Sequence, residues 1–186
     1  MSPSPPPQAA AYGMGACARS MGPDFAEYVN DAIQVLTNAI NDPRAHGDKD
    51  FWSCTDNAVS AVAKIIEAQA DAIDRSVLVP QLLSFLPMLE DQEEGYFVYS
   101  CVVSWIEAND PHVLGENGAN VPGLMAMLTS ILGTGFVDDD LTNRVVNIIM
   151  TVFGQLGTDS AEARAIIGEM DEIDQGKIAQ ILEAMA

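Results

Sequence analysis

The sequence predicts an all-α protein, built as an α-solenoid of paired helices. Three observations lead to this prediction. Apolar residues recur at the i, i+3, i+4, i+7 spacing of amphipathic helices along much of the 186-residue chain. Aromatic residues make up only 6% of the chain, and we find no segment that alternates apolar and polar residues as a strand does. The predicted helices also come in pairs that repeat along the chain.

The first complete pair is predicted from two apolar stripes separated by a charged loop. Residues 25–40 form the first helix and residues 41–50 the loop, "NDPRAHGDKD". The second helix carries its stripe from Val59 to Ile66, and Thr55 or Asp56 is expected to cap its N-terminus. The preceding segment, "AAYGMGACARS", is expected to be the last helix of an earlier pair.

Two further pairs follow. In the second pair, a short helix is expected to open at Pro80, and a longer helix carrying Phe97, Cys101 and Trp105 follows the acidic residues 90–94. In the third pair, the first helix spans residues 121–132, again with a proline at its opening. The second helix is entered through three consecutive aspartates, where a helix dipole favours negative charge. One or two short closing helices are expected between residues 161 and 185.

The spacing of the second helices indicates the repeat type. They end near Ile66, Ile106 and Phe153, which gives a period of roughly 40 to 47 residues, the length of a two-helix HEAT repeat. Stacked hairpins of this kind bury a continuous core. We therefore expect about three helical hairpins plus flanking helices over residues 10–186, after a disordered leader at residues 1–9.

The charge of the chain restricts its partners. Eight Lys and Arg residues stand against 27 Asp and Glu, a formal net charge of −19. No Lys or Arg lies between Arg75 and Arg144. Such a chain is repelled by nucleic-acid phosphates and by anionic membranes, whereas basic proteins are attracted to it. The sequence therefore predicts neither a nucleic-acid nor a membrane partner, and the apolar runs are too short to span a bilayer.

We find no sequence motif for catalysis, a cofactor or a metal. P-loop, nucleophile-elbow, dinucleotide-binding and H-E-x-x-H patterns are absent. His46 and His112 each lie in a polar segment without a neighbouring ligand, so solvated histidines are expected rather than zinc ligands. The three cysteines are far apart, which argues against a disulfide framework. Cys101 shares an apolar face with other core residues and is expected to be a buried structural thiol.

Some apolar side chains have two interpretations. Trp105 lies on a helical stripe and is expected in the core, although aromatic residues also anchor interfaces. Trp52 is expected to pack against the preceding loop. Met125, Met127 and Met150 either fill gaps in the core, which we favour, or form an adaptable groove.

The acidic residues 90–94 also have two interpretations. The stretch "EDQEEG" lacks the spacing of a calcium loop, and a hairpin corner open to water does not split carboxylate pKa values for catalysis. It is then either a solvated helix entry or part of an acidic surface for basic cargo. Asn57 is expected either to form a hydrogen bond between repeats or to contact cargo. The candidate partner-binding residues are thus Asn57, Glu90, Asp91, Glu93 and Glu94.

Four segments carry a family resemblance. "AAYGMGACARSMGPDFAEYV", "TDNAVSAVAKII", "VPQLLSFLPMLEDQEEGYFVY" and "IEANDPHVLGENGANVPGL" resemble the C-terminal part of the importin-β (karyopherin-β) nuclear transport receptors, most closely the importin five branch, also called Ran-binding protein five or karyopherin beta three. The resemblance runs from about Ala10 to the C-terminus and is weaker after Gly133, where the helical pattern and "EIDQGKIAQILEAMA" carry it.

The resemblance implies a role in nuclear import rather than catalysis. Such a receptor binds basic cargo, such as nuclear localisation segments, ribosomal proteins or histones. It meets the GTPase Ran and the nucleoporins as a full-length chain, and it shuttles between cytoplasm and nucleus. The sequence then corresponds to its C-terminal repeats, without the amino-terminal Ran-binding ones. The alternative is a structural or capping segment of another HEAT protein, without cargo contact.

Overall fold

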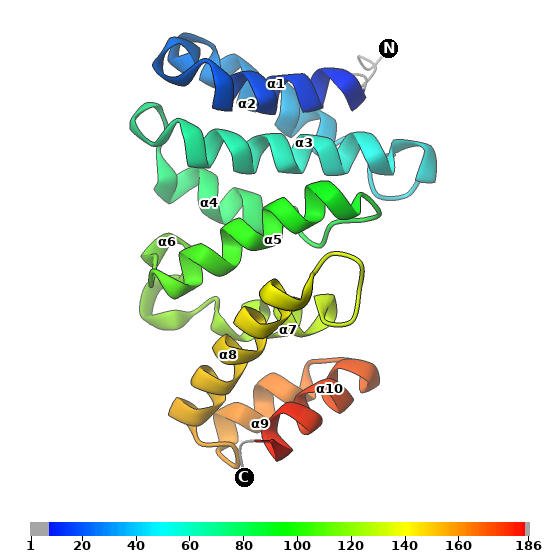
Figure 1. The fold of residues 1–186 in the computed structure, drawn as a ribbon, viewed down its shortest axis with the longest axis vertical. Coiled ribbons are helices and arrows are strands. Elements are labelled where there is room, and N and C mark those ends of the chain that lie inside the picture. Colours follow the sequence, from blue (N-terminus) through cyan, green and yellow to red (C-terminus); the bar gives the residue numbers. More distant parts are fainter. Residues whose placement is uncertain (1–7, 185–186) are drawn as a thin grey trace. The chain divides into compact units, whose positions relative to one another are not determined.

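The structure is a computed structural model of the chain, and it describes residues 8–184. In this range the protein is all-α, as predicted, with ten α-helices, three short 3₁₀ helices and no strand (Figure 1). The α-helices are α1 (Gln8–Ser20), α2 (Val29–Ile40), α3 (Lys49–Ala68), α4 (Arg75–Ser84), α5 (Gln92–Glu107), α6 (Pro111–Leu114), α7 (Val121–Ile131), α8 (Asp139–Leu156), α9 (Ala161–Gly168) and α10 (Glu172–Glu183). The 3₁₀ helices span Gly22–Tyr28, Ala70–Ala72 and Glu116–Gly118.

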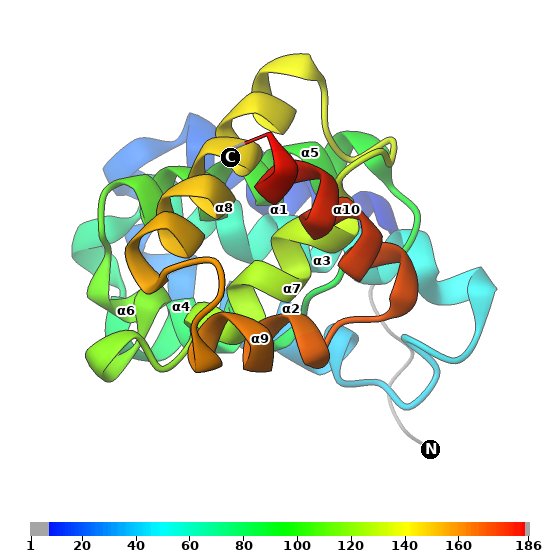
Figure 2. The same cartoon turned by 90° about the horizontal axis from the view of Figure 1, so that it is seen from below.

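The chain forms two compact units. The first unit ends at Cys101 and the second begins at Val102, so the boundary falls inside α5. In the first unit, α1 and α3 form one layer and α2 and α4 a second (Figures 1 and 2). In the second unit, α8 and α10 lie on one side and α7 and α9 on the other (Figure 2). Helices that follow one another thus alternate between two layers in much of each unit.

Small residues bring α1 close to α3 in the first unit. Ala11, Gly15 and Ala18 recur along one buried face of α1. A methyl group added at Gly15 would lie 2.9 Å from Lys64 Cδ and 3.0 Å from Ala61 Cα, so only glycine fits this contact without a shift. The large side chains that are fully buried in this unit include Leu36, Ile40, Ile65, Ile66 and Leu82.

The second unit has its own core. Its largest fully buried side chains come from α7, α8 and α10, and they are Met125, Leu128, Leu141, Ile149, Phe153 and Ile178. Lys177 on α10 donates hydrogen bonds to the Thr129 and Ser130 carbonyl oxygens near the end of α7, at 3.1 and 3.3 Å. These bonds fix α10 against α7.

Several predicted boundaries are confirmed. α8 begins at the three consecutive aspartates, as predicted, and the Asp138 carboxylate caps it by accepting a hydrogen bond from the Leu141 amide at 2.8 Å. Pro122 lies in the first turn of α7. The predicted closing segment forms two helices, α9 and α10. The disordered leader predicted over residues 1–9 is wrong at Gln8 and Ala9, which lie in the first turn of α1, and residues 1–7 lie outside the described residues.

Two predicted boundaries are wrong. The helix predicted over residues 25–40 is a 3₁₀ helix followed by α2, which begins at Val29. α4 begins at Arg75 rather than at Pro80, because the Asp74 carboxylate accepts the Ser76 amide at 2.9 Å and starts the helix earlier. Pro80 is therefore inside α4.

Candidate functional site

The site begins with α3, whose start differs from the prediction. The Asp48 carboxylate caps this helix by accepting the Asp50 amide at 3.1 Å. Thr55 and Asp56, expected at the N-cap, lie well inside the helix and are only 3% and 1% exposed. The capping prediction is therefore wrong, and Asp56 has a different role.

Asp56 binds the loop between α4 and α5. Its carboxylate accepts hydrogen bonds from the amides of Leu89, Glu90 and Asp91, at 2.9, 2.7 and 2.8 Å. Burial raises the pKa of Asp56, while these three amide donors oppose the rise. Since each amide is a donor that burial would otherwise leave unsatisfied, one side chain fixes three consecutive residues of the loop.

The amide of the preceding residue is held from the other side. Met88 donates its amide to the Tyr99 hydroxyl oxygen on α5 at 3.0 Å. Tyr99 is fully buried, and burial raises its pKa to about 12. Together Asp56 and Tyr99 bind four consecutive amides, those of residues 88–91. The acidic corner, residues 90–94, is therefore attached to α3 through Asp56 and to α5 through Tyr99.

The acidic side chains of this corner also make specific contacts. Glu90 accepts a hydrogen bond from the Ser53 hydroxyl at 2.5 Å. Asp91 accepts the Glu94 amide at 3.1 Å and the Asn57 side-chain amide at 3.0 Å. Asn57 also donates to the Ser53 carbonyl oxygen at 2.9 Å. Asn57 therefore joins α3 to the residue before α5, whereas a role between repeats and contact with cargo both stay predictions.

Glu94 forms a buried ion pair with α3. The Lys64 ammonium lies 2.6 Å from the Glu94 carboxylate, and the two side chains are 8% and 9% exposed. The same ammonium lies 5.0 Å from the Tyr12 ring centroid and 5.4 Å from that of Phe97, within the range of cation–π attraction. This pair joins α1, α3 and α5 within the first unit.

An open surface groove of about 400 Å³ lies beside these residues. It brings together four of the five predicted partner-binding residues, namely Asn57, Asp91, Glu93 and Glu94, with Tyr12 and the first residues of α1. Glu90 does not line it. The Asp91 and Glu94 carboxylates already bind Asn57 and Lys64 within the protein. The exposed Glu93 is therefore the carboxylate placed to bind a partner. Tyr12, 53% exposed, offers an aromatic face alongside.

Sequence reasoning missed Tyr12, Lys64 and the role of Asp56. Lys64 had a visible signal, since it is a charged residue inside the apolar stripe of α3 and a buried charge requires a partner. Tyr12 had none, because its contact with Lys64 depends on how α1 packs against α3.

Most of the other predicted side-chain environments agree with the structure, but Met127 and Met150, expected to fill gaps in the core, are only half-buried. Trp105 and Cys101 are buried, and burial raises the pKa of the Cys101 thiol to about 12. Trp52 donates its indole N–H to the His46 carbonyl oxygen at 3.2 Å and so packs on the preceding loop. Met125 is in the core, whereas Met150 is half-buried at a surface groove. In residues 8–184 no three His, Cys, Asp or Glu side chains are grouped as metal ligands would be.

Compared with models of known protein families, the chain matches none. No helix in the described part of the chain is both long and apolar enough to cross a membrane.

Proposed function

We propose that this chain is a protein-binding segment that recruits basic cargo proteins, and that it belongs to an importin-β-type receptor acting in Ran-dependent nuclear import. The observation that carries the proposal is the groove of the first unit, where Asn57, Asp91, Glu93 and Glu94 converge beside Tyr12. Of these carboxylates the exposed Glu93 is available, and together with the exposed Tyr12 ring it suits the ammonium and guanidinium groups of Lys and Arg.

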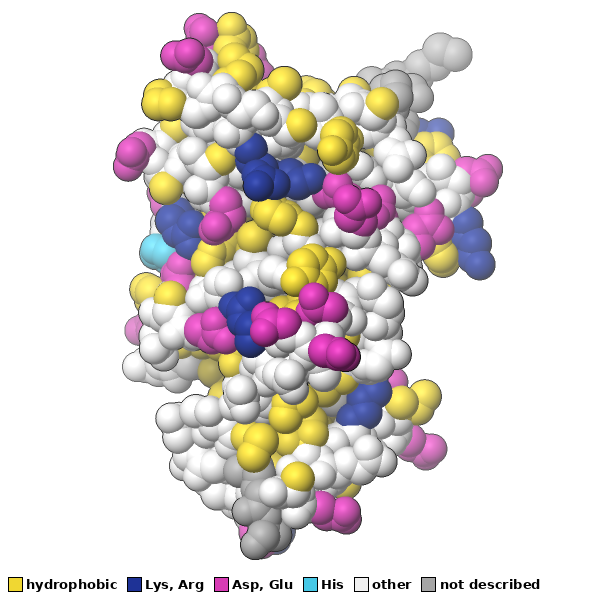
Figure 3. All heavy atoms as spheres, in the orientation of Figure 1, with side chains coloured by type: hydrophobic (Ala, Val, Ile, Leu, Met, Phe, Trp, Pro, Cys, Tyr) yellow, Lys and Arg dark blue, Asp and Glu magenta, His cyan; other side chains and the backbone are white. Residues whose placement is uncertain are grey.

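The electrostatics of the chain support a basic partner. The chain has 27 acidic and 8 basic residues. On the face shown in Figure 3, Asp and Glu side chains outnumber Lys and Arg. Such a field speeds the encounter with a basic protein and weakens as salt is added.

The arrangement of helices supports the repeat architecture. In much of each unit, consecutive helices alternate between two layers, as the hairpins of a HEAT solenoid do (Figures 1 and 2). We propose this architecture for residues 10–186. A full-length receptor of this type contacts Ran and nucleoporins and shuttles between cytoplasm and nucleus, with this segment supplying a cargo surface.

A second candidate function is structural, and one observation favours it. Asn57 on α3 binds Asp91 directly before α5, and Lys64 on α3 pairs with Glu94 in α5, so the acidic residues would join these elements even without cargo. In this case the chain is a scaffold or capping segment of another HEAT protein. The two functions differ in the role of Glu93, which binds the partner only if the groove recruits cargo.

The test is a titration of a fluorescein-labelled peptide rich in Lys and Arg against the full chain, read by anisotropy at about 50 mM and 300 mM salt. We expect Glu93→Gln to weaken binding about threefold or more. Asp71→Asn removes the same charge from an exposed position beyond the end of α3, and it should change binding less than twofold. Equal effects of the two substitutions, or no binding at low salt, would refute cargo binding at this groove and leave the structural function.

A further inference from the structure

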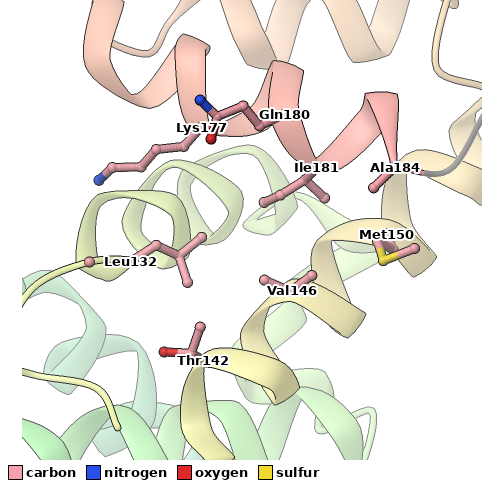
Figure 4. A pocket seen from close by; sticks show the side chains of 9 residues that line it. Leu132, Thr142, Val146, Met150, Lys177, Gln180, Ile181 and Ala184 are labelled. Atoms are coloured by element: carbon pink, nitrogen blue, oxygen red, sulfur yellow. The ribbon is translucent and has the colours of Figure 1, made fainter. Parts of the chain in front are cut away.

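A second groove lies in the second unit, and it is apolar. It has a volume of about 430 Å³ and lies between α8 and α10 at the end of α7. Figure 4 shows Val146, Met150 and Ile181 facing one another across it, with Leu132 and Lys177 at one end and Ala184 at the other. Val146, Met150 and Ile181 are only half-buried, so the groove exposes apolar side chains (Figure 3).

The dimensions of the groove fit two turns of a helix. One wall is formed by Thr142, Val146 and Met150 on α8, and the other by Lys177 and Ile181 on α10 with Ala184 directly after it. Eight residues of α8 rise about 12 Å, and the anchors i, i+4 and i+7 of an apposed helix span about 10 Å.

The lining also favours a helix over an extended peptide. Its side chains are largely apolar, and the polar Lys177 already donates to two carbonyl oxygens and pairs with Asp174 at 2.9 Å. An extended peptide seated there would have to bury amide groups without partners, whereas a helix satisfies its own.

The charge around the groove indicates which charge the bound helix carries beside its apolar face. From residue 102 onward the chain has thirteen acidic and three basic residues, a formal charge of −10. Each of the three basic side chains, Arg144, Arg164 and Lys177, pairs with a carboxylate. Exposed acids stand near both ends of the groove, Asp138–Asp140 before Thr142 and Glu183 before Ala184. A second copy of this chain would be repelled, and a basic segment attracted.

We propose that this groove binds an amphipathic helix of a partner protein, with apolar anchors on one face and Lys or Arg on its flanks. The site lies entirely within the second unit and shares no residue with the acidic groove of the first. The second groove is therefore a separate point of contact. The proposal for it does not depend on whether the first groove binds cargo.

The probe is a labelled 18-residue helical peptide of Leu, Lys and Ala, with leucines at i, i+4 and i+7. We expect saturable binding to the full chain. A peptide of the same composition in scrambled order, and one with Glu in place of Lys, should each bind at least about tenfold more weakly. If the scrambled peptide bound equally well, the proposal that the occupant is a helix would be overturned. If the acidic peptide bound equally well, the proposal that its flanks are basic would be overturned.

Two substitutions locate the site. Ala184→Arg places a cation at an exposed lining position, and we expect about tenfold weaker binding. Asn143→Arg adds the same charge at an exposed position of α8 outside the lining, and it should change affinity less than twofold. Equal effects would overturn the assignment, as would sedimentation showing a dimer that Ala184→Arg dissociates. Glu93→Gln should leave this binding unchanged even if it abolishes binding at the first groove.

Discussion

The ion pair between Lys64 and Glu94 provides a direct measure of how firmly α5 is joined to α3. Both side chains are over 90% buried, and the two charges lie 2.6 Å apart. Removing one partner of a buried pair leaves the other charge without compensation, which typically costs about 3–5 kcal/mol. We expect Glu94→Gln to lower the free energy of unfolding by about 3 kcal/mol, near the bottom of that range, because the Tyr12 and Phe97 rings still attract the ammonium.

Lys64→Met tests the other half of the pair. It removes the ammonium while keeping an unbranched side chain between the two rings, and it leaves the Glu94 carboxylate buried without a cation. We expect a loss of about 4 kcal/mol. The double variant Lys64→Met/Glu94→Gln should lose less than the sum of the two, by about 1–3 kcal/mol, because contacting residues do not behave additively.

The assay is urea unfolding followed by far-UV circular dichroism at 25 °C for the four proteins of the cycle. Arg164→Gln is the matched control, since Arg164 and Asp159 lie 3.8 Å apart and are largely exposed, and it should leave the midpoint unchanged. A loss below about 1 kcal/mol for Glu94→Gln, or strictly additive single losses, would show that the pair behaves like a surface ion pair and would refute this reasoning.

Three further predictions follow from burial and hydrogen bonding. Asp56→Ala leaves three loop amides without an acceptor, so we expect a loss of about 3 kcal/mol or more in urea and faster hydrogen exchange at residues 89–91; unchanged exchange would contradict the contact. Because burial raises the pKa of Cys101 to about 12, a thiol reagent at pH 8 should label the exposed Cys17 rapidly and Cys101 only on unfolding; rapid labelling at both would disprove this. The hydrogen bond from Arg144 lowers the pKa of Glu107 from its ordinary value, so this pair stabilises the fold at neutral pH and its contribution is lost as the pH falls through the lowered pKa. The difference in Tm between the protein and Arg144→Gln should therefore shrink from pH 6 to pH 3, and a constant difference would refute it.

The helices of the second unit were predictable because their signals are local. The Asp138 cap, the proline opening α7 and the apolar stripes all lie within a few residues of the structure they specify. The acidic corner was predictable in the same way, since Glu93 and Glu94 do occupy the first turn of α5.

The start of α3 was not predictable for a different reason. A carboxylate such as that of Asp56 is rarely buried inside a helix, so a position at the cap was the reasonable expectation. Its actual partners are amides 33 to 35 residues later, which local sequence cannot identify. The groove beside Tyr12 likewise depends on the packing of α1 against α3, although four of its lining residues were proposed from their charge and position. The apolar groove of the second unit had one signal, Met150, which was assigned mainly to the core.

The loop between α4 and α5 places an unusual constraint on sequence change. Residues 88–91 are held through their amides, so the number of residues between the two helices is fixed. Homologous proteins should accept neither an insertion nor a deletion there, because either would move every later amide away from Asp56. The Glu90 and Asp91 side chains add their own bonds to Ser53 and Asn57. Proline should be excluded at Met88, Leu89, Glu90 and Asp91, because it has no amide hydrogen to donate. The connection therefore behaves as a fixed-length spacer between α4 and α5 rather than as a flexible linker.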